Sequence, residues 1–174
     1  MIRTGIISAA NSRDIDLPNE PFPLNGRMIP SLSDGQWSYR IERSDTAAEM
    51  CFPDEHYDFD EMSRDCIFLG AYDDDRCIGL AVLRRGMFRY LYLEDLKVSR
   101  AYRGQGAGRA LISAAGEIAS REGYRGLYTI GQDNNLNACL FYLACGFHIG
   151  GFDNHVYNGT SQEGKADIFF YLDC

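Results

Sequence analysis

The sequence is poor in basic residues, because 17 Lys and Arg stand against 25 Asp and Glu, which gives a formal net charge of −8. Nucleic acids and anionic membranes attract proteins through clustered Lys and Arg. We therefore expect neither a nucleic acid nor a membrane to be the main partner. A negative charge is compatible with a cationic small molecule, although it also serves solubility alone.

Long apolar runs are missing as well. No window approaches the length of a membrane span, and the apolar run within residues 1–10 is too short for the core of a secretory signal. The six cysteines form no CxxC pair, which disfavours a zinc knuckle, and they are too sparse for a disulfide scaffold. We expect reduced thiols, no metal site and a cytoplasmic protein.

The length of 174 residues suits one compact domain over residues 1–174. Four of the five prolines lie within residues 1–35, where few apolar positions repeat. We expect that segment to be extended or coil, and the sequence leaves open whether residues 1–19 form a loose extension. A short helix is expected around residues 41–50.

From residue 66 onward the apolar pattern sharpens. Two strands with the turn Asp73–Asp75 between them predict a hairpin, and a second turn is expected at residues 84–87. Period and composition predict strands at 66–72, 77–83, 90–98, 127–130, 147–152 and 166–172, and helices at 107–122 and 137–145. Gly123 and Gly146 are expected to end the two helices. This order predicts an α+β (mixed α/β) fold.

Three alternate glycines, Gly104, Gly106 and Gly108, lie between a predicted strand and a predicted helix. Glycine allows a close backbone approach, and the N–H groups of a first helical turn favour an anion. Arg103 and Arg109 add donors for phosphate oxygens. A Rossmann motif would need a third glycine at Arg109, and a P-loop would need Gly-Lys-Ser/Thr, which is absent. The loop alone predicts a pyrophosphate site or a plain glycine-rich turn.

The neighbouring residues carry a resemblance. The stretches Leu93–Val98 and Ala101–Leu111, followed about thirty residues later by Asn137–Tyr142 and Cys145–Phe147, resemble the cofactor motifs of the GNAT superfamily of N-acetyltransferases. The resemblance implies a mostly antiparallel central sheet, splayed in its middle and flanked by helices. It also implies acetyl-CoA as cosubstrate and makes strand 166–172 a candidate contact of a homodimer.

The resemblance also assigns site residues. Pantetheine would contact Leu96, Lys97 and Val98, and Asn137 would reach the pantetheine or acetyl end. Tyr142 would protonate the departing thiolate. The pyrophosphate would lie on Arg103, Gly104, Gln105, Gly106, Ala107, Gly108 and Arg109.

Elementary chemistry agrees with an acid at Tyr142, because a phenol and a CoA thiol have comparable pKa values. The alternative is that Tyr142 is a core aromatic residue. Acetyl transfer also needs a neutral amine, and removing the proton from a lysine-like amine costs about 4–5 kcal/mol at pH 7. Glu94 or Asp95 could collect that proton. Because side chains alternate along a strand, we expect only one of them to face the substrate, and we favour Glu94. Alternatively, either carboxylate caps backbone or pairs with an arginine.

A narrower resemblance, to the streptothricin acetyltransferases, covers roughly residues 20–172. Its pieces include Gly26–Pro30, Trp37–Tyr39, Phe52–Glu55 and Gly150–Asp153. Enzymes of that group acetylate the β-lysine moiety of a polycationic antibiotic. By this resemblance, Asp54, Glu55, Asp58 and Asp133 are hypothesised to line a cation site. Ile130 stands where the group has Glu, so another amine, on a protein or peptide for example, is the alternative acceptor. A non-catalytic acyl-CoA-binding module is the alternative outside enzymes.

Overall fold

The computed structural model describes residues 1–86 and 88–174, so Met87 of the turn expected at 84–87 lies outside the described residues. The chain divides into two compact units. The first holds residues 1–20, 52–127 and 173–174, and the second holds residues 21–51 and 128–172. The expectation of a single domain remains a prediction.

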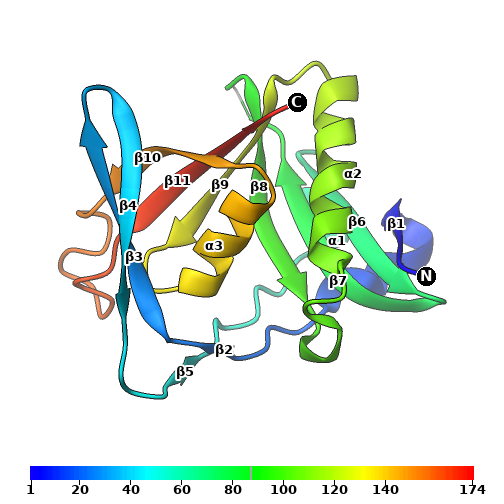
Figure 1. Ribbon diagram of the computed structural model, residues 1–174. Helices are drawn as coiled ribbons and strands as arrows, with labels where there is room; N and C mark the ends of the chain where they lie inside the picture. The colour runs from blue at the N-terminus through cyan, green and yellow to red at the C-terminus, as the bar shows by residue number, and fades with distance from the viewer. Residues whose placement is uncertain (87) are drawn as a thin grey trace. The chain divides into compact units, whose positions relative to one another are not determined.

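The first unit is built on an antiparallel run of strands in the order β1-β6-β7-β8 (Figure 1). The strands are β1 (Arg3–Ile6), β6 (Cys66–Asp73), β7 (Arg76–Arg84) and β8 (Tyr90–Val98). Asp74 has a φ of +51° in the turn that joins β6 to β7, as Asp and Asn tolerate better than most residues. The predicted hairpin and the strand over 90–98 are confirmed.

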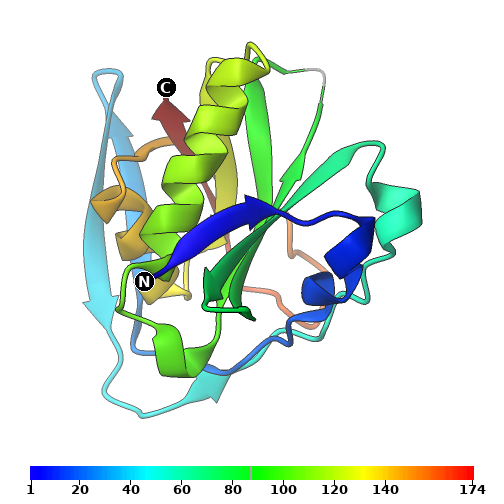
Figure 2. The same cartoon turned by 90° about the vertical axis from the view of Figure 1, so that its right-hand side faces the viewer.

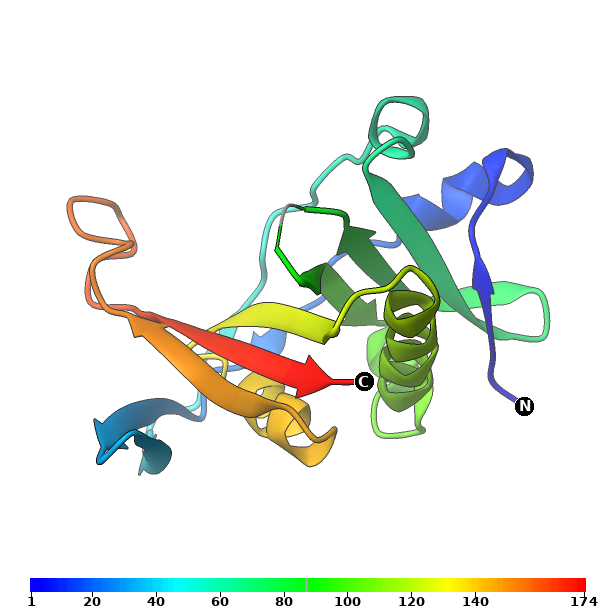
Figure 3. The same ribbon diagram turned by 90° about the horizontal axis from the view of Figure 1, so that it is seen from above.

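Each face of this sheet is covered by different elements. Helix α2 (Ala107–Arg121) lies on one face, and the 3-10 helix η1 (Ala9–Asp16) and the short helix α1 (Phe59–Met62) lie on the other (Figure 3). Helix α2 buries an apolar stripe at helical spacing and ends before Gly123, whose φ is +79°. The predicted helix and its stop are confirmed.

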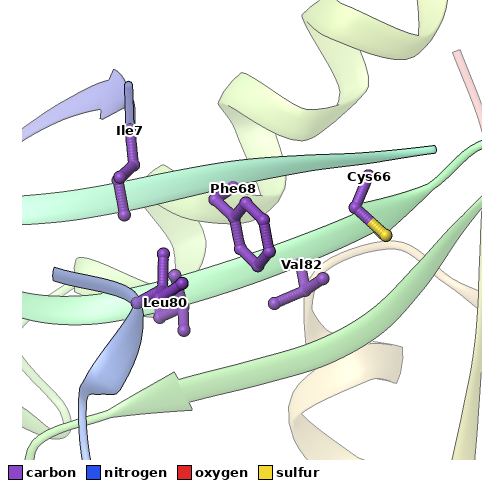
Figure 4. Packing of buried hydrophobic residues seen from close by; sticks show 6 residues of the cluster. Ile7, Cys66, Phe68, Leu80 and Val82 are labelled. Atoms are coloured by element: carbon purple, nitrogen blue, oxygen red, sulfur yellow. The ribbon is translucent and has the colours of Figure 1, made fainter. Parts of the chain in front are cut away.

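Beneath η1 and α1 lies a core of apolar side chains from alternate positions of β6 and β7, joined by Ile7 after β1 and Ile15 of η1 (Figure 4). This core cluster consists of Ile7, Ile15, Cys66, Phe68, Leu80 and Val82. The neighbouring residues of β6 and β7 point to the α2 face, where Gly79 approaches Leu111. Both faces of these central strands are therefore buried, which explains their continuous apolar runs.

The N-terminal residues take part in this unit (Figure 2). Strand β1 pairs antiparallel with β6, and Ile7 and Ile15 are buried at 3% and 4% exposure. Ser8 caps η1, and the side chain of Asn11 accepts a bond from the Ser8 N–H in return. Within residues 1–19, Arg3–Ile6 thus form a paired strand, as the expectation of extended structure allowed, and Ala9–Asp16 form a capped 3-10 helix that was not expected.

The second unit begins with two antiparallel strand pairs. These are β2 (Phe22–Pro23) with β5 (Glu49–Met50), and β3 (Gly26–Ser33) with β4 (Gln36–Arg43). The helix expected over 41–50 is wrong. Trp37, Tyr39 and Ile41 alternate along β4 and oppose Leu32, Pro30 and Met28 of β3, so pairing with β3 decides the conformation.

The rest of the second unit confirms the predicted elements. They are β9 (Gly126–Gln132), which starts in the first unit, α3 (Leu136–Ala144), β10 (His148–Asp153) and β11 (Asp167–Asp173). Their strand order is β9-β11-β10, with β10 and β11 antiparallel. Asn135 caps α3, and Gly146 follows its end with a φ of +95°. The predicted α+β class with mostly antiparallel pairing is confirmed.

All six cysteines are free thiols in the structure. Among residues 1–86 and 88–174, no helix has the length and hydropathy to cross a membrane. Within the same ranges, no three His, Cys, Asp or Glu side chains gather in a way that could hold a metal ion.

Candidate active site

The glycine-rich loop links β8 to α2 in the first unit. After β8 comes a 3-10 turn, η2 (Arg100–Tyr102), and Gly106 is the N-cap of α2. Gly104 and Gly106 have φ values of +75° and +95°, which favour glycine, and a Cβ on either would meet no atom within 4 Å. The first N–H groups of a helix have no intrahelical partner and attract anions. The loop is therefore open to, and suited for, a pyrophosphate.

Two side chains of the loop hold its own backbone. The guanidinium of Arg103 donates to the carbonyl oxygens of Val98 at 3.0 Å and Glu20 at 3.3 Å, and Gln105 donates to Ala101 O at 2.7 Å. These hydrogen bonds engage both side chains with backbone carbonyl groups and so fix the conformation of the loop. Arg109 is exposed in the first turn of α2. The contacts predicted for residues 103–109 remain predictions.

Strand β8 carries Glu94 and Asp95, and its pairing with β7 is irregular at these two residues. Asp95 is opposite Val82, yet Leu93 is opposite the next residue, Leu83, so Glu94 is the extra residue of a β-bulge. In a bulge two residues oppose one, and strict alternation is lost. The expectation that Glu94 and Asp95 point to opposite faces is wrong: contacts described below place both on the face of the core cluster.

Glu94 forms a two-pronged ion pair with Arg84 of β7. The distances are 2.7 Å from Nε to Oε2 and 2.9 Å from Nη2 to Oε1, with 28% of the Glu94 side chain exposed. Both carboxylate oxygens are therefore engaged, and the arginine neutralises the charge. One alternative from the sequence analysis, a carboxylate paired with an arginine, describes Glu94.

Asp95 has different partners. The Tyr57 hydroxyl donates to Asp95 Oδ2 at 3.1 Å, and Lys97 Nζ is 3.4 Å from the same oxygen. Only 17% of the Asp95 side chain is exposed. Burial raises the pKa of Asp95, and Glu55 acts in the same direction, while Lys97 and Tyr57 oppose them without cancelling the rise. Burial and the charge of Asp95 also raise the pKa of Tyr57, so this phenol remains a donor.

Lys97 completes this group, which we call the Asp95 cluster: Glu55, Tyr57, Asp95 and Lys97. Lys97 Nζ is 2.6 Å from Glu55 Oε2 and 5.5 Å from the centroid of the Tyr57 ring. Burial acts to raise the pKa of Glu55, but hydrogen bonds from Lys97 and Asn19 outweigh it and lower this pKa. No motif or spacing in the sequence links Tyr57 or the Lys97 side chain to Asp95, so neither contact was predicted.

The four carboxylates predicted to line a cation site differ in availability. Glu55 is bound to Lys97, and Asp54 and Asp58 are exposed. Asp54 accepts a bond from the Asn19 N–H at 2.7 Å, and Asp58 caps α1 through the N–H of Glu61 at 3.0 Å. Each of these bonds leaves carboxylate lone pairs for a further partner.

Asp133 is instead part of the second unit's interior. It is 1% exposed, forms an ion pair with Arg27, and accepts a hydrogen bond from the Ala166 N–H at 3.1 Å. Its buried charge is thus already balanced, so Asp133 is not available to line a cation site.

Helix α3 of the second unit carries the remaining predicted residues. Asn137 is exposed, and its Oδ1 accepts from Asn25 Nδ2 at 3.2 Å. Tyr142 is 8% exposed, and its ring centroid lies 5.5 Å from those of Phe147 and Phe170. Tyr142 therefore has the aromatic packing of a core residue, and its role as an acid stays a prediction.

Comparison with known proteins now adds to this geometry. Residues 31–147 match the acetyltransferase (GNAT) family. Streptothricin acetyltransferase A of Bacillus subtilis (strain 168) is 34% identical over 163 residues, which are 92% of this chain and 94% of that protein. The chain belongs to the acetyltransferase (GNAT) family.

Solved structures agree with membership of the GNAT family. A protein from Bacillus anthracis str. Ames, described as a streptothricin acetyltransferase and in complex with acetyl coenzyme A, matches with a TM-score of 0.87 and 29% identity. The match covers 100% of this chain and 98% of that one. Nourseothricin acetyltransferase matches with a TM-score of 0.80 and 26% identity over 99% and 98% of the two chains. The chain is an acetyl-CoA-dependent N-acetyltransferase, and the open glycine loop at the start of α2 fits that cosubstrate.

Proposed function

We propose that this enzyme acetylates a primary amine of a cationic small molecule, with the β-lysine moiety of streptothricin as its acceptor. The similarity to streptothricin acetyltransferase A over 92% of the chain carries this proposal. The net charge of −8 and the exposed Asp54 and Asp58 support a cationic acceptor. An amine on a protein or peptide is the second candidate, because Ile130 replaces the Glu typical of that group.

We propose that transfer is direct, in a ternary complex. The acceptor amine forms a bond to the acetyl carbonyl carbon as the bond from that carbon to sulfur breaks. A covalent acyl-cysteine route would need a reactive thiolate. Burial instead raises the pKa of Cys77 to about 11 and that of Cys139 to about 12, so both thiols are neutral at pH 7.

Asp95 is our proposed base for the acceptor's ammonium. Both oxygens of Glu94 are bound to Arg84, whereas the bonds to Asp95 fall on Oδ2, and Oδ1 is the oxygen we propose takes the proton. Burial raises the pKa of Asp95, which brings it closer to the pKa of the ammonium group that Asp95 must deprotonate. A smaller difference between the two pKa values favours proton transfer. Tyr142 is our proposed donor of a proton to the departing thiolate, on the basis of its place in the family motif.

The location and assembly of the enzyme are also proposals. The free state of all six cysteines supports the cytoplasm, since reducing compartments keep thiols unpaired. A homodimer through β11 remains a prediction.

The acceptor is tested by a thiol-release screen with acetyl-CoA. Streptothricin, aminoglycosides, polyamines and lysine-containing peptides serve as acceptors. We expect the highest kcat/KM with streptothricin. Higher kcat/KM with a peptide would establish the second candidate instead.

The two proton-transfer roles are tested by Asp95→Asn and Tyr142→Phe. Because general acid or base catalysis contributes about 10²- to 10⁴-fold, each variant should lose at least about a hundredfold in kcat while calorimetry shows unchanged acetyl-CoA affinity. Glu94→Gln, a change at the neighbouring carboxylate on the same bulge, is the control and should cost less. If Glu94→Gln abolishes turnover and Asp95→Asn does not, the base is Glu94.

A further inference from the structure

The Lys97 side chain lies on the same face of β8 as Asp95. Asp95 is opposite Val82 and Lys97 is opposite Leu80, and both of these partners belong to the core cluster (Figure 4). Only 10% of the Lys97 side chain is exposed, so its ammonium group lies largely out of water. A buried ammonium is costly unless it is paired with negative groups. Lys97 is therefore held where it is by its partners.

Those partners give the Asp95 cluster one cation for two carboxylates. Lys97 Nζ is closer to Glu55, at 2.6 Å, than to Asp95, at 3.4 Å. The Tyr57 hydroxyl supplies a further donor to Asp95 at 3.1 Å. Glu55 thus competes with Asp95 for the same ammonium, so the share of positive charge that Asp95 receives depends on Glu55.

The other charged groups around Asp95 leave Lys97 as its nearest cation. On β8 the neighbour is Glu94, which Arg84 of β7 neutralises. Segment 51–58 contributes Glu55 and Tyr57. Elsewhere on this face, Asp14 of η1 accepts a hydrogen bond from the Tyr72 hydroxyl at 2.8 Å, and the apolar core cluster packs beneath η1 and α1. Burial and Glu55 both favour a protonated Asp95, whereas Lys97 and Tyr57 favour the carboxylate.

We propose that Lys97 is a positioning residue that keeps Asp95 ionised near neutral pH, and that Glu55 limits this effect by sharing the ammonium group. This inference rests on the proposed role of Asp95 as the base, because an ionised Asp95 matters to turnover only if Asp95 accepts the proton. The alternative is that the cluster is only structural and fixes segment 51–58 to β8. It would then have the same contacts, but changing Lys97 or Glu55 would not alter the protonation of Asp95.

The test reads the protonation of Asp95 directly. The side-chain carboxyl carbon is followed by NMR against pH in protein labelled with ¹³C-aspartate, and Asp95→Asn assigns the signal. With Lys97→Met, we expect the Asp95 titration to move up by about one to three pH units, the range for loss of an opposite charge at this distance. Lys97→Arg keeps the cation, so its Asp95 titration should lie close to that of the wild type.

Glu55→Gln should shift the Asp95 titration in the opposite direction from Lys97→Met. Shifts of opposite sign distinguish an electrostatic effect from a common loss of folding. Removing this carboxylate ends the repulsion and frees the ammonium for Asp95, so the titration should move down. A structural role alone predicts a loss of stability for both variants and no shift of opposite sign. Lys97→Met or Glu55→Gln titrations that coincide with wild type overturn the inference.

Kinetics separate this inference from the proposed function. The measurement is the pH profile of kcat/KM with streptothricin. Its acid limb should move with the Asp95 titration in each variant. A limb that comes from the acceptor's own amine should lie at the same pH in all variants. Turnover of Asp95→Asn equal to that of wild type would refute the proposed base and, with it, the catalytic meaning of Lys97. A normal loss in Asp95→Asn with an unmoved acid limb in Lys97→Met refutes the role of Lys97 alone.

Discussion

The glycine-rich loop at residues 103–109 and the four carboxylates predicted for the acceptor differ in how their chemistry arises. The loop acts through its backbone, with positive φ at Gly104 and Gly106 and the first N–H groups of α2. The carboxylates act through side chains, and their partners come from far along the chain. Glu55 meets Lys97, 42 residues away, and Asp133 meets Arg27, 106 residues away.

This contrast explains which assignments a sequence supports. A backbone feature is set by residue types within a few positions, so the glycine spacing and the helix start already define an anion site. The role of a charge depends on what neutralises it, and the fold alone decides that. Of the four predicted carboxylates, Asp133 is a buried partner of an arginine, Glu55 belongs to the Asp95 cluster, and Asp54 and Asp58 are exposed.

The largest expected effect is a loss of stability on replacing Asp133, the buried member of the four carboxylates. Replacing it with Ala leaves Arg27 without its carboxylate and the Ala166 N–H without its acceptor, so the free energy of unfolding should fall by about 3 kcal/mol. Chemical denaturation measures this. Glu42→Gln breaks an exposed ion pair with Arg40 on β4 and should cost at most about 1 kcal/mol.

An Asp133→Ala enzyme of unchanged stability, with a tenfold higher KM for streptothricin, would contradict this assignment. Asp133 would then return to the acceptor site that the sequence suggested.

The next effect breaks the loop itself. Gly106→Val puts a β-branched residue at a φ of +95° at the N-cap position, next to the residues that carry the first N–H groups of α2. We expect the KM for acetyl-CoA to rise at least about tenfold, or roughly 1.4 kcal/mol, in initial-rate measurements.

Gly159→Val is the matched control, because Gly159 has a φ of +74° and equally open surroundings outside the loop. It carries similar backbone strain, so it should lower stability without changing the KM for acetyl-CoA. Equal effects of both substitutions on that KM would show that strain, rather than an anion site, explains the loss.

Prediction of the fold from the sequence succeeded where one strong periodicity or one glycine marks an element. The apolar runs of β6 and β7 and the stripe of α2 are of this kind. It failed at residues 41–50, where Ile41 ends an alternation that begins at Trp37 and is stabilised by β3 across a tight turn. Strand β1 in segment 1–19 pairs with β6, whose residues lie 63 to 69 positions further along the chain.

Within the candidate site, the loop was predictable and the bulge was not. Nothing in the string Leu93–Leu96 marks Glu94 as an extra residue, since a bulge follows from the register against β7. The bulge placed two carboxylates on one face and gave each a different partner. Tyr57 and the Lys97 ammonium, which both contact Asp95 Oδ2, are brought to this carboxylate only by folding.

The smallest effect tests Asp58, one of the two exposed carboxylates. Asp58→Ser removes a charge yet keeps the N-cap of α1, because a serine hydroxyl also accepts from the helix N–H groups. If Asp58 attracts a cationic acceptor, kcat/KM for streptothricin should fall about two- to threefold at low ionic strength, and the difference should vanish in salt.

Glu117→Gln, at an exposed position of α2, changes the net charge by the same amount and serves as the control for Asp58→Ser. Equal losses in the two variants would assign the effect to overall charge, and unequal losses that persist in salt would point to a direct contact. Only a loss confined to Asp58→Ser and removed by salt fits local steering, since screening weakens attraction between exposed charges but not a buried ion pair such as that of Asp133.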